Sequence, residues 1–235
     1  MKKIFVNEVG PRDGLQNIDI ILNIDERFQL IQSLERAGIN SLEVGSFVSP
    51  KAVPAMDKTD ALLEKLSTGN SNYSVLIPNT HGYKQAKENK VKEVCLVLCA
   101  TESMNMENIN KNIKDTITEF KEIIKMAKKD QIRTKIYISV AFECPYEGPV
   151  NSQYVYDLTK EFVSYGINEV VIADTIGAGN PNQVQKVFRE LVKDFGSSVF
   201  SAHFHDTRLL ALSNVKAAME EGITKFDSSI AGLGG

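Results

Sequence analysis

The stretch YVYDLTKEFVSYGINEVVIAD, residues 154–174, contains one full unit of the pattern that decides the fold. Its apolar residues first recur every three or four positions, which is typical of an amphipathic helix. Gly166 follows, and glycine commonly ends helices because it adopts the left-handed backbone conformation without strain. The run 169–174 is short, apolar and rich in Val and Ile, as in a strand buried on both faces. A helix that leads directly into a buried strand indicates a parallel sheet with crossover helices.

The same alternation recurs along the whole chain. Strands are predicted at residues 4–9, 41–47, 73–77, 93–100, 135–142, 169–174, 199–205 and 226–230. Helical spacing lies between them, for example at 25–37, 109–128, 154–165, 181–195 and 209–221. Eight parallel strands in 235 residues fit an α/β fold of the closed (β/α)8 TIM-barrel type better than an open doubly wound sheet. Residues 1–235 are therefore expected to form a single catalytic TIM-barrel domain.

The composition limits the partners that this chain can have. With 43% hydrophobic residues it can bury a full core, and its formal net charge of -3 gives no general attraction to nucleic acid or anionic membranes. The apolar runs are strand-sized, far short of the roughly 20 residues that span a bilayer. Residues 1–3 lead directly into a strand, so no signal or transit peptide is predicted. We expect neither a nucleic-acid partner nor a membrane partner.

Cysteine usage points to a reducing compartment. The chain has three cysteines, Cys95, Cys99 and Cys144, and their spacing matches no metal motif. On one strand, Cys95 and Cys99 would lie about 13 Å apart, which is too far for a disulfide. We therefore expect free thiols and a cytoplasmic location.

Unusual polar residues follow the ends of the predicted strands. In TIM barrels the chemistry takes place at the C-terminal ends of the strands, so these positions are candidates for a site. They are Arg12 and Asp13 after the first strand, Glu43 and Ser46 in the second, Asn79 after the third, residues 143–148 after the fifth, Asp174 and Thr175 in and after the sixth, and His203 with His205 in the seventh.

Three of these residues suggest a divalent-metal site. His203 and His205 are two apart on one strand, so their side chains point to the same side and can share an ion. Only the eighth strand separates their strand from the one that precedes Asp13, which adds a carboxylate. One carboxylate with two imidazoles suits Mg²⁺, Mn²⁺, Zn²⁺ or Fe²⁺, and the oxygen ligand favours the harder ions. The alternative is a pair of hydrogen-bonded strand histidines with no metal.

A series of motifs resembles one enzyme family. The stretch NEVGPRDGLQN at residues 7–17 is similar to the first-strand signature of the 3-hydroxy-3-methylglutaryl-CoA lyases. Further similar motifs occur in the same order: LEVGSFVSPK at 42–51, PN at 78–79, CPYEG at 144–148, DTIGAG at 174–179, HFHDT at 203–207 and DSSIAGLGG at 227–235. The resemblance covers the whole chain, and the string GPRDGLQN is typical of the lyases rather than of the related isopropylmalate and homocitrate synthases.

The resemblance implies a function and a set of roles. The expected reaction is a divalent-metal-dependent retro-Claisen cleavage of 3-hydroxy-3-methylglutaryl-CoA, an acyl-CoA thioester, to acetyl-CoA and acetoacetate, carried out by a homodimer with Mg²⁺ or Mn²⁺. The implied metal ligands are Asp13, His203 and His205. His203 is the favoured proton acceptor, with Asp13 as the second candidate. The implied catalytic residues are Arg12, Asp13, Glu43 and His203, and the implied substrate-binding residues are Arg12, Gln16, Ser46 and Thr175.

The individual roles follow from the chemistry. Arg12 would stabilise the oxygen of the enolate that forms when the carbon–carbon bond breaks. Glu43 would orient a metal ligand or Arg12. Simpler explanations remain: Arg12 with Asp13 could be a local ion pair, and Glu43 could pair with another barrel charge. Asp174 could either cap backbone donors or support the site, and Cys144 is expected to be a packed thiol.

The sequence departs from the family at its end. In the lyases the Gly-Leu-Gly-Gly string continues into a cysteine, a mobile loop, an asparagine ligand and covering helices, whereas this sequence stops at Gly235. We therefore expect a barrel that lacks its final helix and C-terminal segment, with apolar surface uncovered at the eighth strand. Arg208 and Leu209 also stand where the lyases usually carry a tyrosine and a glycine.

Two other functions are consistent with this sequence. The chain could be a truncated, catalytically inactive relative that binds metal or an acyl-CoA without turnover. It could also be a related metal-dependent aldolase or Claisen condensing enzyme that acts on a different acyl-CoA or on a 2-oxo acid. A metal-dependent cleavage assay distinguishes these possibilities.

Overall fold

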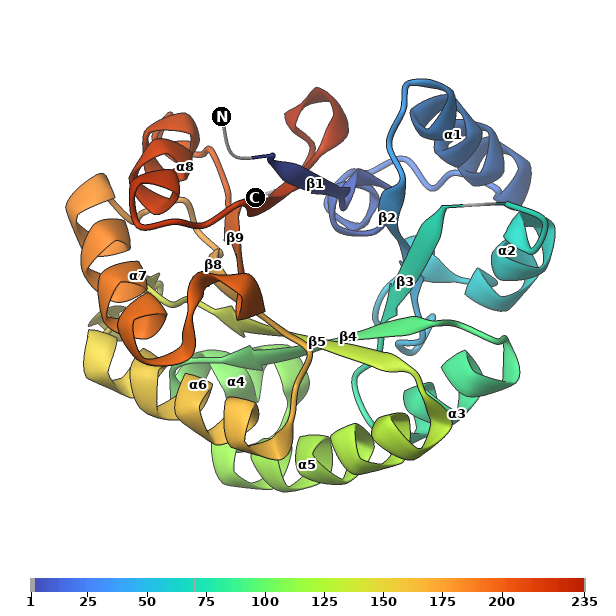
Figure 1. Ribbon diagram of the computed structural model, residues 1–235. Coiled ribbons are helices and arrows are strands. Elements are labelled where there is room, and N and C mark those ends of the chain that lie inside the picture. Colours follow the sequence, from blue (N-terminus) through green and yellow to red (C-terminus); the bar gives the residue numbers. More distant parts are fainter. Residues whose placement is uncertain (1–2, 70, 235) are drawn as a thin grey trace.

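The strands of the computed structural model close into a parallel barrel (Figure 1), with the order β1-β10-β9-β8-β5-β4-β3-β2. The structure describes residues 3–69 and 71–234. Gly235, the last residue of the motif at 227–235, lies outside the described residues. The barrel strands are β1 (Phe5–Glu8), β2 (Ser41–Ser46), β3 (Asn72–Leu76), β4 (Glu93–Cys99), β5 (Arg133–Ser139), β8 (Glu169–Asp174), β9 (Phe200–Phe204) and β10 (Lys225–Ser228). The predicted TIM barrel is confirmed.

The helices form a ring outside the strands (Figure 1). They are α1 (Ile24–Arg36), α2 (Thr59–Leu66), α3 (Thr80–Glu88), α4 (Glu102–Ile109), α5 (Ile113–Asp130), α6 (Ser152–Tyr165), α7 (Pro181–Phe195) and α8 (Ala211–Glu220). Local sequence explains their ends. Asn23 and Asn180 each form a capping box at the start of a helix, and Gly166 ends α6 with a φ of 85°.

Two details differ from the sequence prediction. The helix predicted at residues 109–128 corresponds to α5, which begins at Ile113, and the sequence prediction missed α4, which ends where Asn110 adopts a left-handed conformation with a φ of 55°. A small antiparallel hairpin of β6 (Glu143–Cys144) and β7 (Gly148–Pro149) follows β5. Residues of α4 and of the segment after it, such as Met104 and Lys111, line a cavity at the C-terminal end of the barrel.

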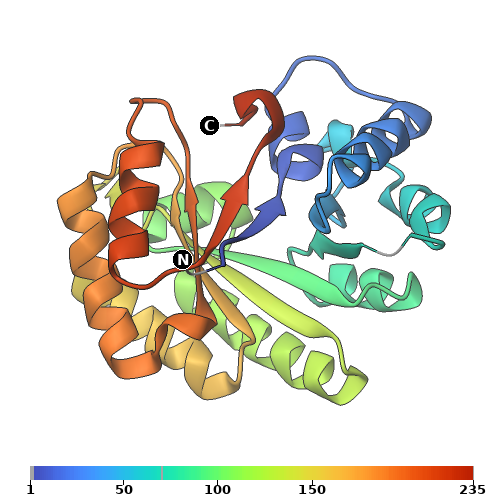
Figure 2. The ribbon, with the colours of Figure 1, turned by 45° about the horizontal axis from the view of Figure 1, so that its top comes forward.

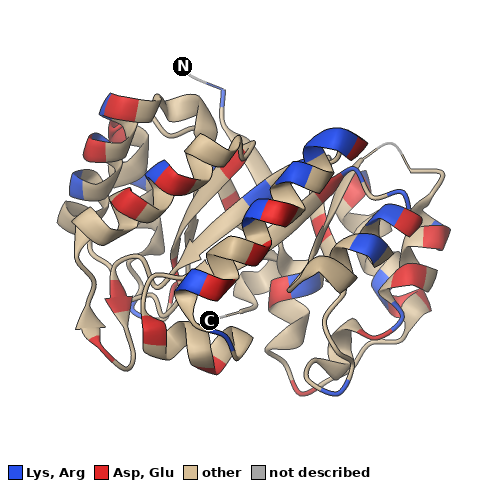
Figure 3. Cartoon of the chain, turned by 90° about the horizontal axis from the view of Figure 1, so that it is seen from below, with Lys and Arg blue, Asp and Glu red and all other residues tan. Residues whose placement is uncertain are grey.

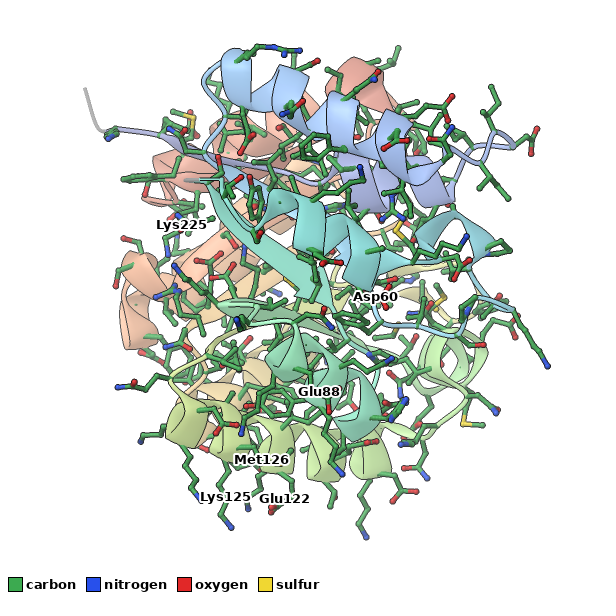
Figure 4. All side chains as sticks on the ribbon, turned by 90° about the vertical axis from the view of Figure 1, so that its right-hand side faces the viewer. Asp60, Glu88, Glu122, Lys125, Met126 and Lys225 are labelled. Atoms are coloured by element: carbon green, nitrogen blue, oxygen red, sulfur yellow. The ribbon has the colours of Figure 1, made fainter. Side chains whose placement is uncertain are left out.

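Charged side chains pair with one another at the N-terminal end of the barrel. Lys135 is buried and lies 3.3 Å from Glu169 and 3.6 Å from Glu93. Lys225, labelled in Figure 4, lies 2.9 Å from Glu169 on the other side. Burial alone would raise the pKa of the Glu169 carboxyl, but the two lysines lower it below its usual value. These paired charges line a second cavity at this end of the barrel, whereas the predicted site residues lie at the opposite end.

The outer surface is polar on the helices and partly apolar on β1. Acidic and basic residues alternate along the helices (Figure 3), as with Glu122 and Lys125 on the exposed face of α5 (Figure 4). On β1, by contrast, Phe5 is 52% exposed and Val6 is 42% exposed. Within the described residues, no helix combines the length and the apolarity needed to cross a bilayer.

The region after the last strand matches the sequence expectation in part. Within the described residues, β10 is followed by the short turn η4 (Ile230–Gly232) and by no α-helix. The expected apolar exposure occurs, but it lies on the neighbouring strand β1, which pairs with β10 (Figure 2). Phe226 of β10 itself is only 6% exposed. The turn η4 packs against the segment that follows β1.

Candidate active site

The turn after β1 places Arg12 and Asp13 over the open end of the barrel. This turn is η1 (Gly10–Gly14). At its start, the backbone N–H groups of Arg12 and Asp13 donate to the Val9 carbonyl, at 3.0 and 2.7 Å. The turn requires glycine at its start, because a Cβ on Gly10 would lie 2.5 Å from Glu8 Oε1. The close packing of this turn holds both functional side chains inward, where they are buried.

The three predicted metal ligands lie together. Asp13, His203 and His205 each offer a ligand atom, and these atoms lie within 4.8 Å of one another. Asp13 Oδ2 is 3.8 Å from His203 Nε2 and 3.3 Å from His205 Nε2, and the two imidazole centroids are 4.7 Å apart. His205 lies one residue beyond the end of β9, yet both rings face the same side, as the strand alternation predicted. One oxygen and two nitrogens that converge in this way fit a divalent cation.

A carboxylate behind His203 was not predicted from the sequence. His203 Nδ1 lies 2.9 Å from Asp227 Oδ2, and Asp227 is held in turn by Asn7 Nδ2, which donates to its Oδ1 at 2.9 Å. A metal-binding histidine commonly donates its second ring N–H to a carboxylate in this way. This bond turns His203 Nε2 toward Asp13, where it could bind a cation. Asp227 therefore fixes both the tautomer and the orientation of the ring.

Charges in the site shift several pKa values. Burial alone would raise the pKa of the Asp13 carboxyl, but the Arg12 guanidinium and a hydrogen bond from His205 lower it well below its usual range. Burial opposes the charging of His203, yet its hydrogen bond to Asp227 and the charges of Asp227 and Asp13 raise the pKa of its ring above the ordinary value. Asp13 is therefore ionised at neutral pH and available as a ligand.

Arg12 is held between two carboxylates. Its Nε donates to Glu43 Oε1, and its Nη1 donates to Asp13 Oδ1 at 2.6 Å. Burial disfavours the charged guanidinium, but Glu43 and Asp13 outweigh this effect and raise the Arg12 pKa above its already high value. Glu43 is completely buried, and its second oxygen accepts a hydrogen bond of 3.0 Å from the Tyr137 hydroxyl. The hydrogen bonds that Arg12 makes with described residues use Nε and Nη1, which leaves Nη2 for a ligand.

Tyr137 is a second residue that sequence reasoning missed. Its hydroxyl lies 3.0 Å from Glu43 Oε2 and 2.9 Å from Asp227 Oδ2, so one phenol faces the carboxylate that holds Arg12 and the carboxylate that holds His203. In the sequence, Tyr137 looks like one more apolar residue of a buried strand. A polar atom at the centre of a barrel strand was the available signal, both for Tyr137 and for Asp227.

A cavity of about 450 Å³ opens from these residues, and its lining includes Arg12, Asp13, His203 and His205. The predicted substrate-binding residues Gln16, Ser46 and Thr175 also line it, together with Asn79, Met104 and Lys111. Ser46 Oγ is buried and has no hydrogen-bond partner among the described residues. Thr175 Oγ1 accepts a bond of 2.8 Å from the Val140 N–H. A ligand bound here would reach the metal ligands at one end of the cavity.

Two other sequence candidates have structural roles. Asp174 accepts bonds from the backbone N–H groups of Ala178 and Gly179, at 3.0 and 2.9 Å, so it caps the turn after β8. Burial raises the pKa of the Asp174 carboxyl. Cys144 is buried, and its sulfur accepts a bond of 3.1 Å from the Thr101 hydroxyl. It is a packed thiol, as expected.

The closed parallel barrel, with a carboxylate and two imidazoles at its C-terminal end and a cavity beside them, defines a TIM-barrel protein with a candidate divalent-metal site. A family model described as HMGL-like matches residues 3–235. The chain belongs to this family.

Curated relatives are lyases of one kind. The chain is 39% identical to the hydroxymethylglutaryl-CoA lyase of Bacillus subtilis (strain 168), a match that covers 100% of this chain and 79% of the relative. It is 38% identical to the mitochondrial hydroxymethylglutaryl-CoA lyase of Homo sapiens and covers 72% of that protein. The resemblance inferred from the motifs is confirmed, and the chain is shorter than these relatives.

Solved structures agree with this assignment. The hydroxymethylglutaryl-CoA lyase of Pseudomonas aeruginosa superposes with a TM-score of 0.95 at 38% identity, over 100% of this chain and 78% of that one. A lyase from Acinetobacter baumannii, solved with coenzyme A and 3-methylmalate, has a TM-score of 0.95 at 33% identity and is covered to 76%. The carboxyl transferase domain of Rhizobium etli pyruvate carboxylase shares the fold alone, at 17% identity and a TM-score of 0.73.

Proposed function

We propose that this chain cleaves 3-hydroxy-3-methylglutaryl-CoA to acetyl-CoA and acetoacetate, with Mg²⁺ or Mn²⁺ as its cation. One observation carries the proposal: Asp13, His203 and His205 converge within 4.8 Å at the end of a cavity that Arg12 also lines. The curated lyases, 36–39% identical to this chain over nearly its whole length, support this substrate over a 2-oxo acid. They also favour an active enzyme over a relative that only binds.

The donor set fits a hard or borderline divalent ion. Asp13 would supply a carboxylate oxygen, and His203 and His205 would each supply Nε2. When bound, such a cation lowers the pKa of a coordinated hydroxyl and orients the substrate. A cation held by these three side chains would have further coordination positions for substrate oxygens or water.

The reaction requires a base for the tertiary hydroxyl. This hydroxyl gives its proton to the base, the bond between C2 and C3 breaks, C3 becomes the ketone of acetoacetate, and the electron pair passes to the thioester enolate. Protonation at C2 then yields acetyl-CoA. His203, favoured from the resemblance, and Asp13 both face the cavity and are the two candidate bases. Because His203 Nδ1 is held by Asp227 and its Nε2 would hold the cation, we favour Asp13, whose carboxylate has a second oxygen.

Arg12 is placed to stabilise the enolate. Glu43 and Asp13 fix the guanidinium at Nε and Nη1, so the remaining nitrogen can donate to a developing negative oxygen without reorganisation. Because Arg12 is only 5% exposed, water competes little for this contact. The buried, unpartnered Ser46 hydroxyl, with Thr175 and Gln16, would bind the acyl group in the same cavity.

An assay on the purified chain tests the proposed function. We expect acetoacetate and acetyl-CoA to form from the hydroxymethylglutaryl thioester, turnover to stop on chelation, and added Mg²⁺ or Mn²⁺ to restore it. Metal uptake without turnover would instead identify an inactive binding relative. Product formation only from a 2-oxo acid would identify a condensing enzyme. The homodimer and the cytoplasmic location stay predictions, which light scattering and fractionation can test.

His205→Ala is expected to weaken metal binding without unfolding the barrel. The imidazole offers Nε2 to the site, while its Nδ1 has no hydrogen-bond partner among the described residues, so its removal breaks little of the fold. We expect the dissociation constant for Mn²⁺ to rise by more than about 100-fold, because the loss of a direct ligand should exceed the tenfold to 100-fold loss typical of residues that only support a ligand. Calorimetry with Mn²⁺ and a thermal melt measure the two effects.

The matched control for this variant is His81→Ala. His81 is exposed on α3 and lies outside the ligand group, so its loss should change neither Mn²⁺ affinity nor thermal stability. Full metal occupancy in purified His205→Ala would contradict the assignment of His205 as a ligand.

A further inference from the structure

Tyr137 lies at the base of the candidate site, where two supporting carboxylates meet. It belongs to β5, is only 3% exposed and lines the cavity. Its ring packs edge-on against His203, with centroids 5.9 Å apart and an interplanar angle of 85°. Its hydroxyl lies within hydrogen-bond distance of Glu43 Oε2 and Asp227 Oδ2. The residue therefore contacts the supports of both halves of the site.

The two carboxylates serve different functional groups. Glu43 comes from β2 and holds the guanidinium of Arg12 through its other oxygen. Asp227 comes from β10 and holds the imidazole of His203. Among the described residues, Tyr137 is the side chain that hydrogen-bonds to both carboxylates. If one carboxylate moves, the Tyr137 hydroxyl can therefore change its hydrogen bond to the other carboxylate.

Glu43 and Asp227 must share the one hydrogen of the Tyr137 hydroxyl. A phenol carries one O–H donor, whereas two ionised carboxylate oxygens face it at 3.0 and 2.9 Å. The hydroxyl can rotate about its C–O bond, so it can donate fully to only one of them at a time. Each carboxylate keeps a second partner, Arg12 for Glu43 and His203 for Asp227. Neither group is therefore left without a bond when the hydroxyl turns away.

We propose that Tyr137 is a positioning residue whose single hydroxyl hydrogen is shared between Glu43 and Asp227, and that it thereby couples the orientation of Arg12 to that of His203. The inference rests on the proposed function, because Arg12 and His203 have their roles in that reaction. Burial and the two carboxylates raise the pKa of the Tyr137 phenol well above its usual value, so the phenol keeps its hydrogen. Tyr137 does not need to touch the substrate to act in this way.

The first test is Tyr137→Phe, which keeps the packed ring and removes the hydroxyl. We expect kcat to fall by about tenfold to 100-fold, KM to change by less than about threefold, and Mn²⁺ affinity to fall by about tenfold. The matched control is Tyr83→Phe. Tyr83 is 1% exposed, donates to Asp130 at 2.7 Å and is not among the residues that line the cavity. This variant removes the same group and should leave kcat and Mn²⁺ affinity unchanged.

The decisive test is a coupling measurement with Mn²⁺ affinity as the readout. Glu43→Gln and Asp227→Asn are measured singly and together, first with Tyr137 present and then in combination with Tyr137→Phe. With Tyr137 present we expect the combined effect to differ from the product of the single effects by about fivefold or more. With Tyr137→Phe this factor should fall close to one. An equal factor in both backgrounds would overturn the proposal.

The Mn²⁺ readout separates a failure of the Tyr137 role from a failure of the proposed function. Mn²⁺ affinity does not depend on turnover, so coupling without cleavage of the thioester would refute the proposed function and leave the role of Tyr137 intact. If Tyr137→Phe does not fold, 3-fluorotyrosine at position 137 keeps the ring and the hydroxyl and strengthens the donor. The coupling should then persist, and its loss in that folded variant would count against the shared hydroxyl.

Discussion

Arg12→Met is expected to lower kcat by about 10²–10³-fold, the effect of removing one fixed donor from a developing oxyanion. The flexible Met side chain can occupy much of the same space but offers no hydrogen for the enolate oxygen. Mn²⁺ affinity should change by less than about tenfold, because Asp13, His203 and His205 all remain. Steady-state kinetics and Mn²⁺ titration of the same preparation separate the two effects, and an unchanged kcat would refute the enolate role.

This substitution also disturbs a buried ion pair. Without Arg12, the fully buried Glu43 keeps only the Tyr137 hydroxyl as a partner, and an unpaired buried charge costs about 3–5 kcal/mol of stability. The control is therefore the double variant Arg12→Met with Glu43→Gln, which removes the stranded charge. We expect it to recover much of the thermal stability and none of the turnover. Recovery of both would mean that Arg12 acts through folding alone.

The barrel and the metal ligands could be predicted because they follow from short-range rules. Short apolar strands and helices ended by residues such as Gly166 are visible in local sequence, and the parallel strands of a barrel bring their C-terminal ends to one face. Asp13 and His205 are 192 positions apart, yet the fold places them 3.3 Å from each other. The family motifs supplied the substrate and the assigned roles, which barrel geometry alone does not give.

Other features depend on tertiary contacts that the sequence does not display. The break between α4 and α5 is fixed by Asn105, whose completely buried side chain donates to the Lys111 carbonyl at 2.7 Å and accepts from the Cys99 N–H at 3.0 Å. The sequence prediction placed one helix at residues 109–128, close to α5, and did not predict α4. Only the packed structure shows why the chain turns there.

The supporting residues of the site were hidden for a related reason. Glu43 was predicted to orient a ligand or Arg12, and the structure places it against Arg12. Tyr137 and Asp227 were assigned no role, because an inward-facing strand residue looks like core until its neighbours are known. Their partners come from β2, β5, β9 and β10, and the alignment of these strands decides which side chains meet. Sequence patterns predict that strands exist more readily than how they align.

Asp13→Asn should have the largest effect on metal binding. The amide has nearly the same shape as the carboxylate, so the variant removes the charge and little else. Asp13 is the one acidic member of the ligand group found in the described residues, and its Oδ2 faces both imidazole Nε2 atoms at 3.3 and 3.8 Å. We expect a loss of about 3–5 kcal/mol, which is a factor of about 100 to 4,000 in Mn²⁺ affinity, and turnover below detection.

The control for this charge removal is Asp206→Asn, next to His205 in the sequence. Asp206 is exposed, caps the Ala211 N–H at 2.9 Å and lies outside the ligand group. If any nearby negative charge were enough to attract a cation, both substitutions would weaken binding alike. If Asp13 is a ligand, Asp206→Asn changes Mn²⁺ affinity by less than about threefold, and only Asp13→Asn loses the ion. An exposed charge such as Asp206 is largely screened at physiological salt, whereas a direct ligand is not. Equal losses of Mn²⁺ affinity in the two variants would therefore contradict the assignment of Asp13 as a ligand.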